Sequence, residues 1–293
     1  MSTNVLVPID GSDQSYGGLV YALRSFPEAT ITTLHVINIE REWSDIAGFP
    51  DTWEERARKR AAEFHERANE KANKYNGGIE TETVDGVPHK QILRYTIENN
   101  IDHIVMGSHG ESPITRPFVG HVTEAVARRS PVSVSIVPES ATDTESRDLP
   151  GRILVPVDGS EQATAALGFA LNQFRETPIT VLHVIDVAVD YSHEQLQGTY
   201  VEDQLDELRE RADDLLRSTV EQTQADRDIQ TETTYGKPAQ SIVEFSSDNE
   251  FDQIVMGSRG RSRVAHLFGS VAETVVQRSP LPVTVVRESA GTH

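Results

Sequence analysis

Short apolar runs alternate with helical patterns along both halves of the chain. Runs rich in valine, isoleucine and leucine predict strands, whereas apolar residues spaced by three or four predict amphipathic helices. Serine or aspartate before a helical pattern, and proline in its first turn, mark where helices begin. In the first half we predict strands at 4–9, 30–37, 80–84, 103–106 and 132–137, and helices at 13–25, 51–75, 88–99 and from about Gly120.

Each half therefore has five strands alternating with four helices. This order predicts an α/β fold, with a doubly wound, five-stranded parallel sheet (strand order 3-2-1-4-5) covered by helices on both faces. Ligands of such sheets lie at the carboxyl ends of the strands. Asp10, Val36 and Gly107 fall at predicted strand ends, so we expect them to converge on one ligand.

The longest helix of each half is amphipathic. Its apolar residues recur every three or four positions, which predicts one buried stripe along a solvated, charged helix. The predicted stripe contains Trp53, Ala57, Ala61, Phe64, Ala68 and Ala72 in the first half, and Val201, Leu205, Leu208, Ala212, Leu215 and Val220 in the second.

The whole pattern occurs twice. Residues 5–12 return as 153–160, an offset of 148, and Asp102 returns as Asp252, an offset of 150. A period this long indicates a duplicated domain, since solenoid repeats have about 20–50 residues. We predict one domain at 1–139, a linker rich in Ser, Thr, Asp and Glu at 140–150, and a second domain at 151–288.

Composition and charge narrow the choice of partners. The chain has no cysteine, which excludes disulfides and thiolate metal sites and fits a cytoplasmic protein. No apolar run is long enough to cross a membrane, and the net charge of −19 disfavours binding to nucleic acid.

Only five of the 27 basic residues are lysines. An acidic, lysine-poor surface suits a high-salt cytoplasm, so we infer a halophilic source; the alternative is an ordinary acidic protein.

Two glycine-rich loops carry the main candidate chemistry. Gly107-Ser108-His109-Gly110 leads to Gly120 in the first half, and Gly257-Ser258-Arg259-Gly260 leads to Gly269 in the second. Each loop joins a strand to a helix. Glycines let the backbone approach an anion closely, and the first N–H groups of a helix have no intrahelical partners. The spacing predicts one phosphate site in each half; the plainer interpretation is that the glycines serve only the turn.

The aspartates after the first strand of each half are further candidates. Asp10 and Asp158 could cap the helices that follow them. Ser12 and Ser160 are equally good caps, which would leave the aspartates for a ligand.

The remaining motifs do not support an enzyme. His35 and His183 lie in apolar strands, where we expect packed, hydrogen-bonded rings, and His103, His109 and His121 lack metal-ligand spacing. Neither a Gly-x4-Gly-Lys-Ser/Thr loop nor a Gly-x-Gly-x-x-Gly loop after the first strand is present, and no catalytic constellation can be assigned. We predict no catalytic residue and no metal site, with slow ATP hydrolysis left open.

Together these residues resemble the tandem, two-domain form of the universal stress protein family. The resemblance covers nearly the whole chain and rests on Pro-x-Asp-Gly-Ser, Leu-His-Val and Gly-x2-Gly-x9-Gly-Ser/Thr. It implies a cytoplasmic stress-response protein that binds ATP, with or without Mg²⁺. Aspartates and prolines would contact the adenosine, valines the adenine edge, methionines the ribose, and the loops the phosphates. The implied residues are Pro8, Asp10, Val36, Met106, Gly107, Gly110, Gly120 and Val122, and Pro156, Asp158, Val184, Met256, Gly257, Gly260, Gly269, Ser270 and Val271.

Each half departs from the family pattern at one point. The first half keeps the nine-residue spacer but has His121 where the pattern has a hydroxyl. The second half keeps Ser270 but has an eight-residue spacer between Gly260 and Gly269.

Charge distinguishes the two loops. The second carries Arg259, Arg261 and Arg263 without a carboxylate, whereas Glu111 opposes Arg116 in the first. Because arginine forms strong charge-assisted bonds to phosphate, we predict that ATP binds more tightly to the second half. A nucleotide-free interaction scaffold of the same fold remains an alternative.

The last strands suggest how the domains assemble. Val132, Val134 and Ile136 alternate with serines, and Val283 and Val285 recur in the second half. Since exposed strand edges are usually covered or paired, we expect an intramolecular pseudo-dimer of the two domains through these edges. Homodimerisation of the chain is a further open alternative.

Overall fold

The computed structural model describes residues 3–38, 51–75, 77–109, 119–141, 149–186, 201–260 and 269–287. Contacts divide the chain between Leu149 and Pro150 into two compact units, here unit 1 and unit 2. The predicted limits of 139 and 151 for the domains stay a prediction.

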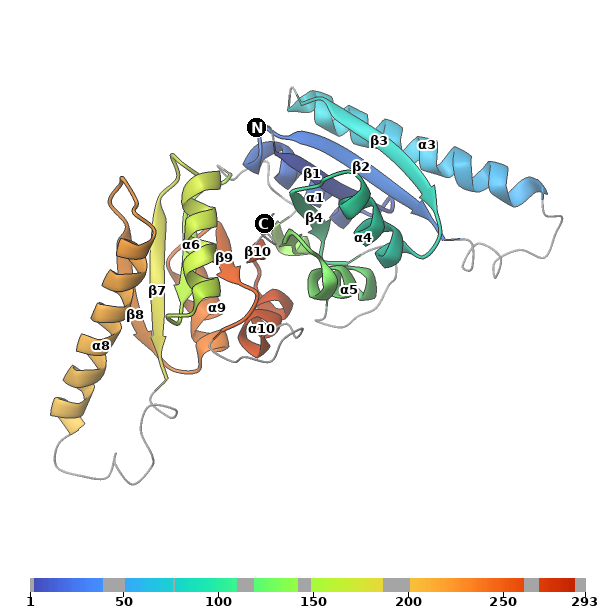
Figure 1. Cartoon of the computed structure of the whole chain (residues 1–293). Coiled ribbons are helices and arrows are strands. Elements are labelled where there is room, and N and C mark those ends of the chain that lie inside the picture. Colours follow the sequence, from blue (N-terminus) through green and yellow to red (C-terminus); the bar gives the residue numbers. More distant parts are fainter. Residues whose placement is uncertain are drawn as a thin grey trace. The chain divides into compact units, whose positions relative to one another are not determined.

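Unit 1 is a doubly wound α/β domain. Its strands are all parallel, in the order β3-β2-β1-β4-β5, which confirms the predicted topology (Figure 1). Its elements are β1 (Asn4–Ile9), α1 (Asp13–Ser25), β2 (Thr30–Ile37), α3 (Asp51–Lys74), β3 (Ile79–Asp85), α4 (Pro88–Glu98), β4 (His103–Gly107), α5 (His121–Arg129), β5 (Ser133–Val137) and the 3₁₀ turn η1 (Glu139–Ala141).

Unit 2 repeats this arrangement. Its order β8-β7-β6-β9-β10 is the counterpart of the order in unit 1, again with parallel neighbours. Its elements are β6 (Ile153–Val157), α6 (Glu161–Gln173), β7 (Ile179–Ile185), α8 (Val201–Gln222), β8 (Gln230–Tyr235), α9 (Pro238–Asp248), β9 (Gln253–Gly257), α10 (Ser270–Arg278) and β10 (Val283–Val286).

Helices cover each sheet in two layers. In unit 1, α1 and α3 contact each other and the sheet, and α4 and α5 contact each other and form the second layer. In unit 2 the corresponding pairs are α6 with α8 and α9 with α10. Central strands covered on both faces are apolar throughout rather than alternating. Accordingly Val5, Leu6 and Val7 are fully buried, as are Ile104 and Val105.

The long helices pack by the predicted stripes, with one shift. In α3, all of the predicted residues are buried except Phe64, which is half-buried. In α8, Leu208 and Ala212 are buried as predicted, but Leu216 and Thr219 complete the buried face, while Leu205, Leu215 and Val220 are only half-buried. A helix advances about 100° per residue, so apolar residues beside the stripe remain at its margin.

His103 is the most deeply buried histidine of the described residues. Its Nε2 lies 2.8 Å from Ser135 Oγ, and its ring lies 4.8 Å from that of Phe26. Complete burial lowers the pKa of His103 to about 3, because the interior disfavours the charged ring. The counterpart in unit 2 is Gln253, whose Nε2 donates to Pro150 O over 3.0 Å.

We predict that His103 makes the protein sensitive to acid. Below a pH of about 6.5 the unfolded chain protonates this histidine, whereas the folded chain keeps it neutral down to about pH 3. The free energy of unfolding should therefore fall as pH falls through this window, by up to about 1.4 kcal/mol per pH unit from this residue. His103→Gln should flatten the fall and the reciprocal Gln253→His should steepen it, measured by urea unfolding at pH 7 and pH 5. Equal slopes in all three proteins would contradict the prediction.

Candidate functional site

The carboxyl ends of three neighbouring strands bring the predicted site residues of unit 1 together. Ile9 pairs with His35, which places Asp10 beside Val36, and Leu6 pairs with Ile104, which places Gly107 at the same edge. The same register in unit 2 brings Asp158, Val184 and Gly257 together. These residues lie at neighbouring strand ends, as predicted; that they bind one ligand stays a prediction.

Each aspartate is held by the serine that caps the next helix. Asp10 Oδ1 accepts hydrogen bonds from Ser12 N at 3.1 Å and from Ser12 Oγ at 2.5 Å. The hydroxyl of Ser12 in turn accepts from Ser15 N and caps α1. The serine is therefore the cap, as predicted, and it binds one oxygen of the aspartate. That the aspartate also binds a ligand stays a prediction.

Unit 2 has the same arrangement with a further contact. Asp158 Oδ1 accepts from Ser160 N at 3.0 Å and from Ser160 Oγ at 2.6 Å. A Cβ placed on Gly260 would lie 2.5 Å from Asp158 Oδ2, so the carboxylate would have to shift to make room for a side chain there. The second glycine of this loop thus lets the backbone lie directly against the aspartate. Its counterpart Gly110 lies outside the described residues.

The first glycine of each loop has a packing role. A Cβ on Gly107 would lie 2.6 Å from Gln14 O, and a Cβ on Gly257 would lie 2.8 Å from the Gln162 carbonyl. The neighbouring atoms are backbone of α1 and α6, so they cannot rotate away. The fold alone therefore requires these two glycines, whatever the loops bind.

The last glycine of each loop is the N-cap of the next helix, and a glycine has no side chain that could bond to the first N–H groups. Gly120 and Gly269 are the N-caps of α5 and α10, and neither helix has a side-chain cap. Gly120 N donates to Ser108 O over 2.7 Å, and Gly269 N donates to Ser258 O over 2.9 Å. The first-turn N–H groups of such helices have no intrahelical acceptors, so they are suited to an anion.

The first turns of these helices also carry the remaining phosphate-side candidates. His121 and Ser270 are exposed, and Val122 and Val271 are half-exposed.

The predicted adenosine-side residues differ in exposure. Val36, Val184 and Pro8 are half-exposed, so part of their surface is open to a ligand, whereas Pro156 is buried. Met106 and Met256 are each only 5% exposed, which leaves little of either side chain for a ribose.

The strand histidines are structural, as predicted. His35 Nδ1 lies 2.9 Å from Ile9 O, and His183 Nδ1 lies 2.8 Å from Val157 O. Since a carbonyl oxygen only accepts, the Nδ1 of each ring is the protonated nitrogen that donates.

Positive charge gathers at the loop of unit 2. Arg259 is half-buried, and its Nε is enclosed without a hydrogen-bond partner among the described residues. Burial and the positive charge of Arg259 lower the pKa of Arg287, the residue after β10. Sequence reasoning found Arg259 but missed Arg287; the signal was its register, because Gly257 pairs with Val286. Arg261 and Arg263, like Glu111 and Arg116, lie outside the described residues.

The equivalent position in unit 1 is weaker in charge. His109 replaces Arg259, and its Nδ1 lies 3.1 Å from Ser108 Oγ. Its Nε2 is buried and has no hydrogen-bond partner within the described ranges. A neutral ring nitrogen makes a weaker bond to phosphate than a guanidinium does.

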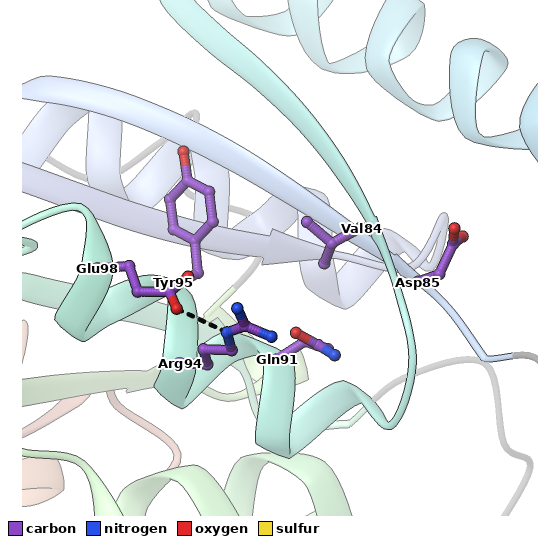
Figure 2. A pocket seen from close by; sticks show the side chains of 6 residues that line it. All are labelled: Val84, Asp85, Gln91, Arg94, Tyr95 and Glu98. Carbon is purple, nitrogen blue, oxygen red and sulfur yellow. Dashed lines mark hydrogen bonds and ion pairs between the residues drawn. The ribbon is translucent and has the colours of Figure 1, made fainter.

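A separate hollow of about 340 Å³ lies between the end of β3 and α4, lined by Val84, Asp85, Gln91, Arg94, Tyr95 and Glu98 (Figure 2). Its charges are paired: Arg94 Nε with Glu98 at 2.7 Å, and Asp85 with Arg58 at 3.5 Å. Burial, with Glu82 and Glu80 nearby, raises the pKa of Tyr95. Carboxylates on and around this hollow repel phosphate, so it is a poor alternative site for an anion.

The described residues contain neither a cluster of metal-binding side chains nor a helix that could cross a membrane. They contain no group of three or more His, Cys, Asp or Glu that could hold a metal ion. Within the same ranges, every helix is too short or too polar to span a bilayer.

Each unit is thus a doubly wound domain in which a glycine loop leads to a helix N-terminus without a side-chain cap. The chain belongs to the universal stress protein family, whose model matches residues 1–138 and 150–287. A universal stress protein of Mycobacterium tuberculosis is 25% identical over 97% of both chains. One from Methanocaldococcus jannaschii is 31% identical over 47% of this chain and 82% of its own length. In fold, the chain is similar to a crystal structure of a universal stress protein from Archaeoglobus fulgidus, with a TM-score of 0.69 and 24% identity over 98% of this chain and 97% of that one.

We predict opposite effects for two glycine substitutions. Gly107→Ala should lower the free energy of unfolding by roughly 1–3 kcal/mol, because its methyl group would overlap the backbone of α1. Gly168→Ala should raise the free energy of unfolding by roughly 0.4–1 kcal/mol. In α6 the added methyl group has space, and in the unfolded chain alanine has less conformational freedom than glycine. Urea midpoints followed by circular dichroism measure both. A Gly107→Ala protein as stable as the wild type would show that this glycine is not required for packing.

Proposed function

We propose that this chain is a stress-response regulator that binds adenine nucleotide, with ATP held at the carboxyl strand ends of each unit and more tightly in unit 2. The observation that carries the proposal is the set of groups at one edge of unit 2. There a serine-held aspartate lies where a side chain on the second loop glycine would be, and a helix N-terminus has no side-chain cap. An enclosed arginine nitrogen has no hydrogen-bond partner within the described part of the chain. Such groups suit a ligand with both hydroxyl and phosphate groups.

The preference for unit 2 rests on matched positions. Arg259 and Ser270 stand where unit 1 has His109 and His121. A charge-assisted hydrogen bond contributes roughly 1.5–3 kcal/mol, against about 1 kcal/mol for a neutral one. We propose no protein ligand for Mg²⁺, which would arrive coordinated by the nucleotide's phosphates.

We place the protein in the cytoplasm, without catalytic residues, and with its two units joined as an intramolecular pseudo-dimer through their final strands. Within its own unit, β5 is bonded to β4 and β10 to β9. An edge strand of this kind is usually covered or paired. Homodimerisation of the chain remains a second possible level of assembly.

Matched substitutions test which unit binds. Asp158→Asn and Asp10→Asn both keep the oxygen that accepts from the cap serine and remove only the negative charge. In calorimetric titration with ATP, we expect Asp158→Asn to weaken the tighter site about tenfold, or roughly 1.4 kcal/mol. Asp10→Asn should leave that site unchanged, since it alters only unit 1.

Three results would each point to a different conclusion. Loss of tight binding only in Asp10→Asn would identify unit 1 as the stronger site. A wild-type chain, stripped of bound ligand, that binds no adenine nucleotide would favour an interaction scaffold. Steady release of phosphate that Asp158→Asn abolishes would favour a slow ATPase.

We also propose a halophilic adaptation, and it predicts a response to salt. With a net charge of −19, repulsion between surface carboxylates should fade as potassium chloride rises from dilute to molar, while apolar burial persists. The melting temperature should therefore rise over that range. A variant with glutamine at the exposed positions Glu54 and Glu55 should show a smaller rise. A flat or falling melting temperature would remove the inference.

A further inference from the structure

Two arginines of unit 2 come from neighbouring strand ends. Arg259 follows β9 by two residues, and Arg287 directly follows β10. Gly257 pairs with Val286, and Ser258 N donates to Val286 O over 3.3 Å. The two chain segments therefore leave the sheet side by side, at the edge that also carries Asp158.

The two guanidinium groups are close enough to act on each other. The charge of Arg259 adds to burial in lowering the pKa of Arg287. Like charges in a partly buried setting repel, and an anion with two or more charges between them relieves that repulsion. The enclosed Nε of Arg259, which has no hydrogen-bond partner among the described residues, is a donor that such an anion would satisfy.

Unit 1 lacks both arginines. In unit 1 Gly107 pairs with Val137, just as Gly257 pairs with Val286 in unit 2. The residue that follows Val137 is Pro138, so Pro138 is the counterpart of Arg287. His109 takes the place of Arg259. The two units thus differ by two permanent positive charges at one corner of an otherwise equivalent edge.

Strand order places this corner at one end of the site. From Val184 on β7, the strand ends run through Asp158 after β6 and the glycine loop after β9 to Arg287 after β10. Neighbouring strands lie about 4.8 Å apart, so the track spans three spacings, or about 14 Å. A nucleotide whose adenine lies at Val184 would bring its first phosphate to the loop and its last phosphates to the arginines.

We propose that Arg259 and Arg287 together bind the terminal phosphates of a nucleotide, so that unit 2 distinguishes nucleoside triphosphates from monophosphates. The inference rests on the proposed function for the nucleoside end of the site, and on the arginine pair for the phosphate end. Unit 1, with His109 and Pro138, has no basis for such discrimination.

Titration of the intact chain with ATP and AMP at constant ionic strength tests the pair. Arg287→Gln and Arg259→Gln should each weaken ATP binding about tenfold and AMP binding less than about twofold. Arg287→Lys, which keeps the charge, should recover part of the preference for ATP. The matched control is Arg278→Gln, which removes one charge from the exposed far end of α10 and should leave the ratio of ATP to AMP affinity unchanged.

Inorganic tripolyphosphate separates this inference from the proposed function. It should raise the melting temperature of the wild type and raise that of Arg287→Gln less. Stabilisation by tripolyphosphate that depends on both arginines, with no binding of ATP, would support the pair and remove the proposed function. Tight ATP binding that is unchanged in Arg287→Gln would contradict the proposed role of the arginine pair, but it would leave the proposed function intact. A ligand-free Arg287→Gln that melts lower and loses ATP and AMP affinity equally would assign Arg287 a structural role and also overturn the pair.

Discussion

The hydrogen bonds between a cap serine and the preceding aspartate organise the strand-end edge of both units. Ser12 and Ser160 use the hydroxyl oxygen to begin a helix and the hydroxyl proton to bind the aspartate. One side chain therefore sets where the helix starts and how the carboxylate is oriented. In unit 2 the loop glycine Gly260 then lies against this fixed carboxylate. These contacts fix the aspartate and the start of the helix through bonds within the protein itself, so no ligand is needed to order them.

Duplication has preserved this framework while the chemistry around it has changed. Strand order, cap serines and packing glycines are the same in both units. The differences include histidine or arginine in the loop, proline or arginine after the last strand, and histidine or glutamine in the buried fourth strand. The two units therefore share a fold but differ in charge and proton affinity at corresponding positions.

Much of this arrangement followed from the sequence because local periodicity determines it. Continuous apolar runs and residues spaced by three or four located the strands and helices to within a residue or two, and the two cap serines were recognised from their position before a helix. The buried stripe predicted for α8 was only partly correct, because Leu216 and Thr219 also face the sheet and are buried. Which residues face the sheet depends on how the helix is rotated about its own axis. That rotation depends on tertiary contacts and not on spacing.

What the sequence could not provide were contacts between segments far apart along the chain. Gly107 was predicted to line a ligand, and the backbone of Gln14 gives it a packing role as well. Nothing near either residue in the sequence indicates that packing. Arg287 looked like an ordinary residue after the last strand until the register of β9 and β10 placed it beside the loop. Both depend on how parallel strands align.

The glycine that ends β4, and the one that ends β9, restrict which mutations such a protein can accept. Each fixes the distance between sheet and helix at a place where no side chain fits, so mutation cannot alter that point without loss of stability. The two copies within this chain agree with that restriction: both keep the glycine, whereas the residue two positions further on is His109 in one copy and Arg259 in the other.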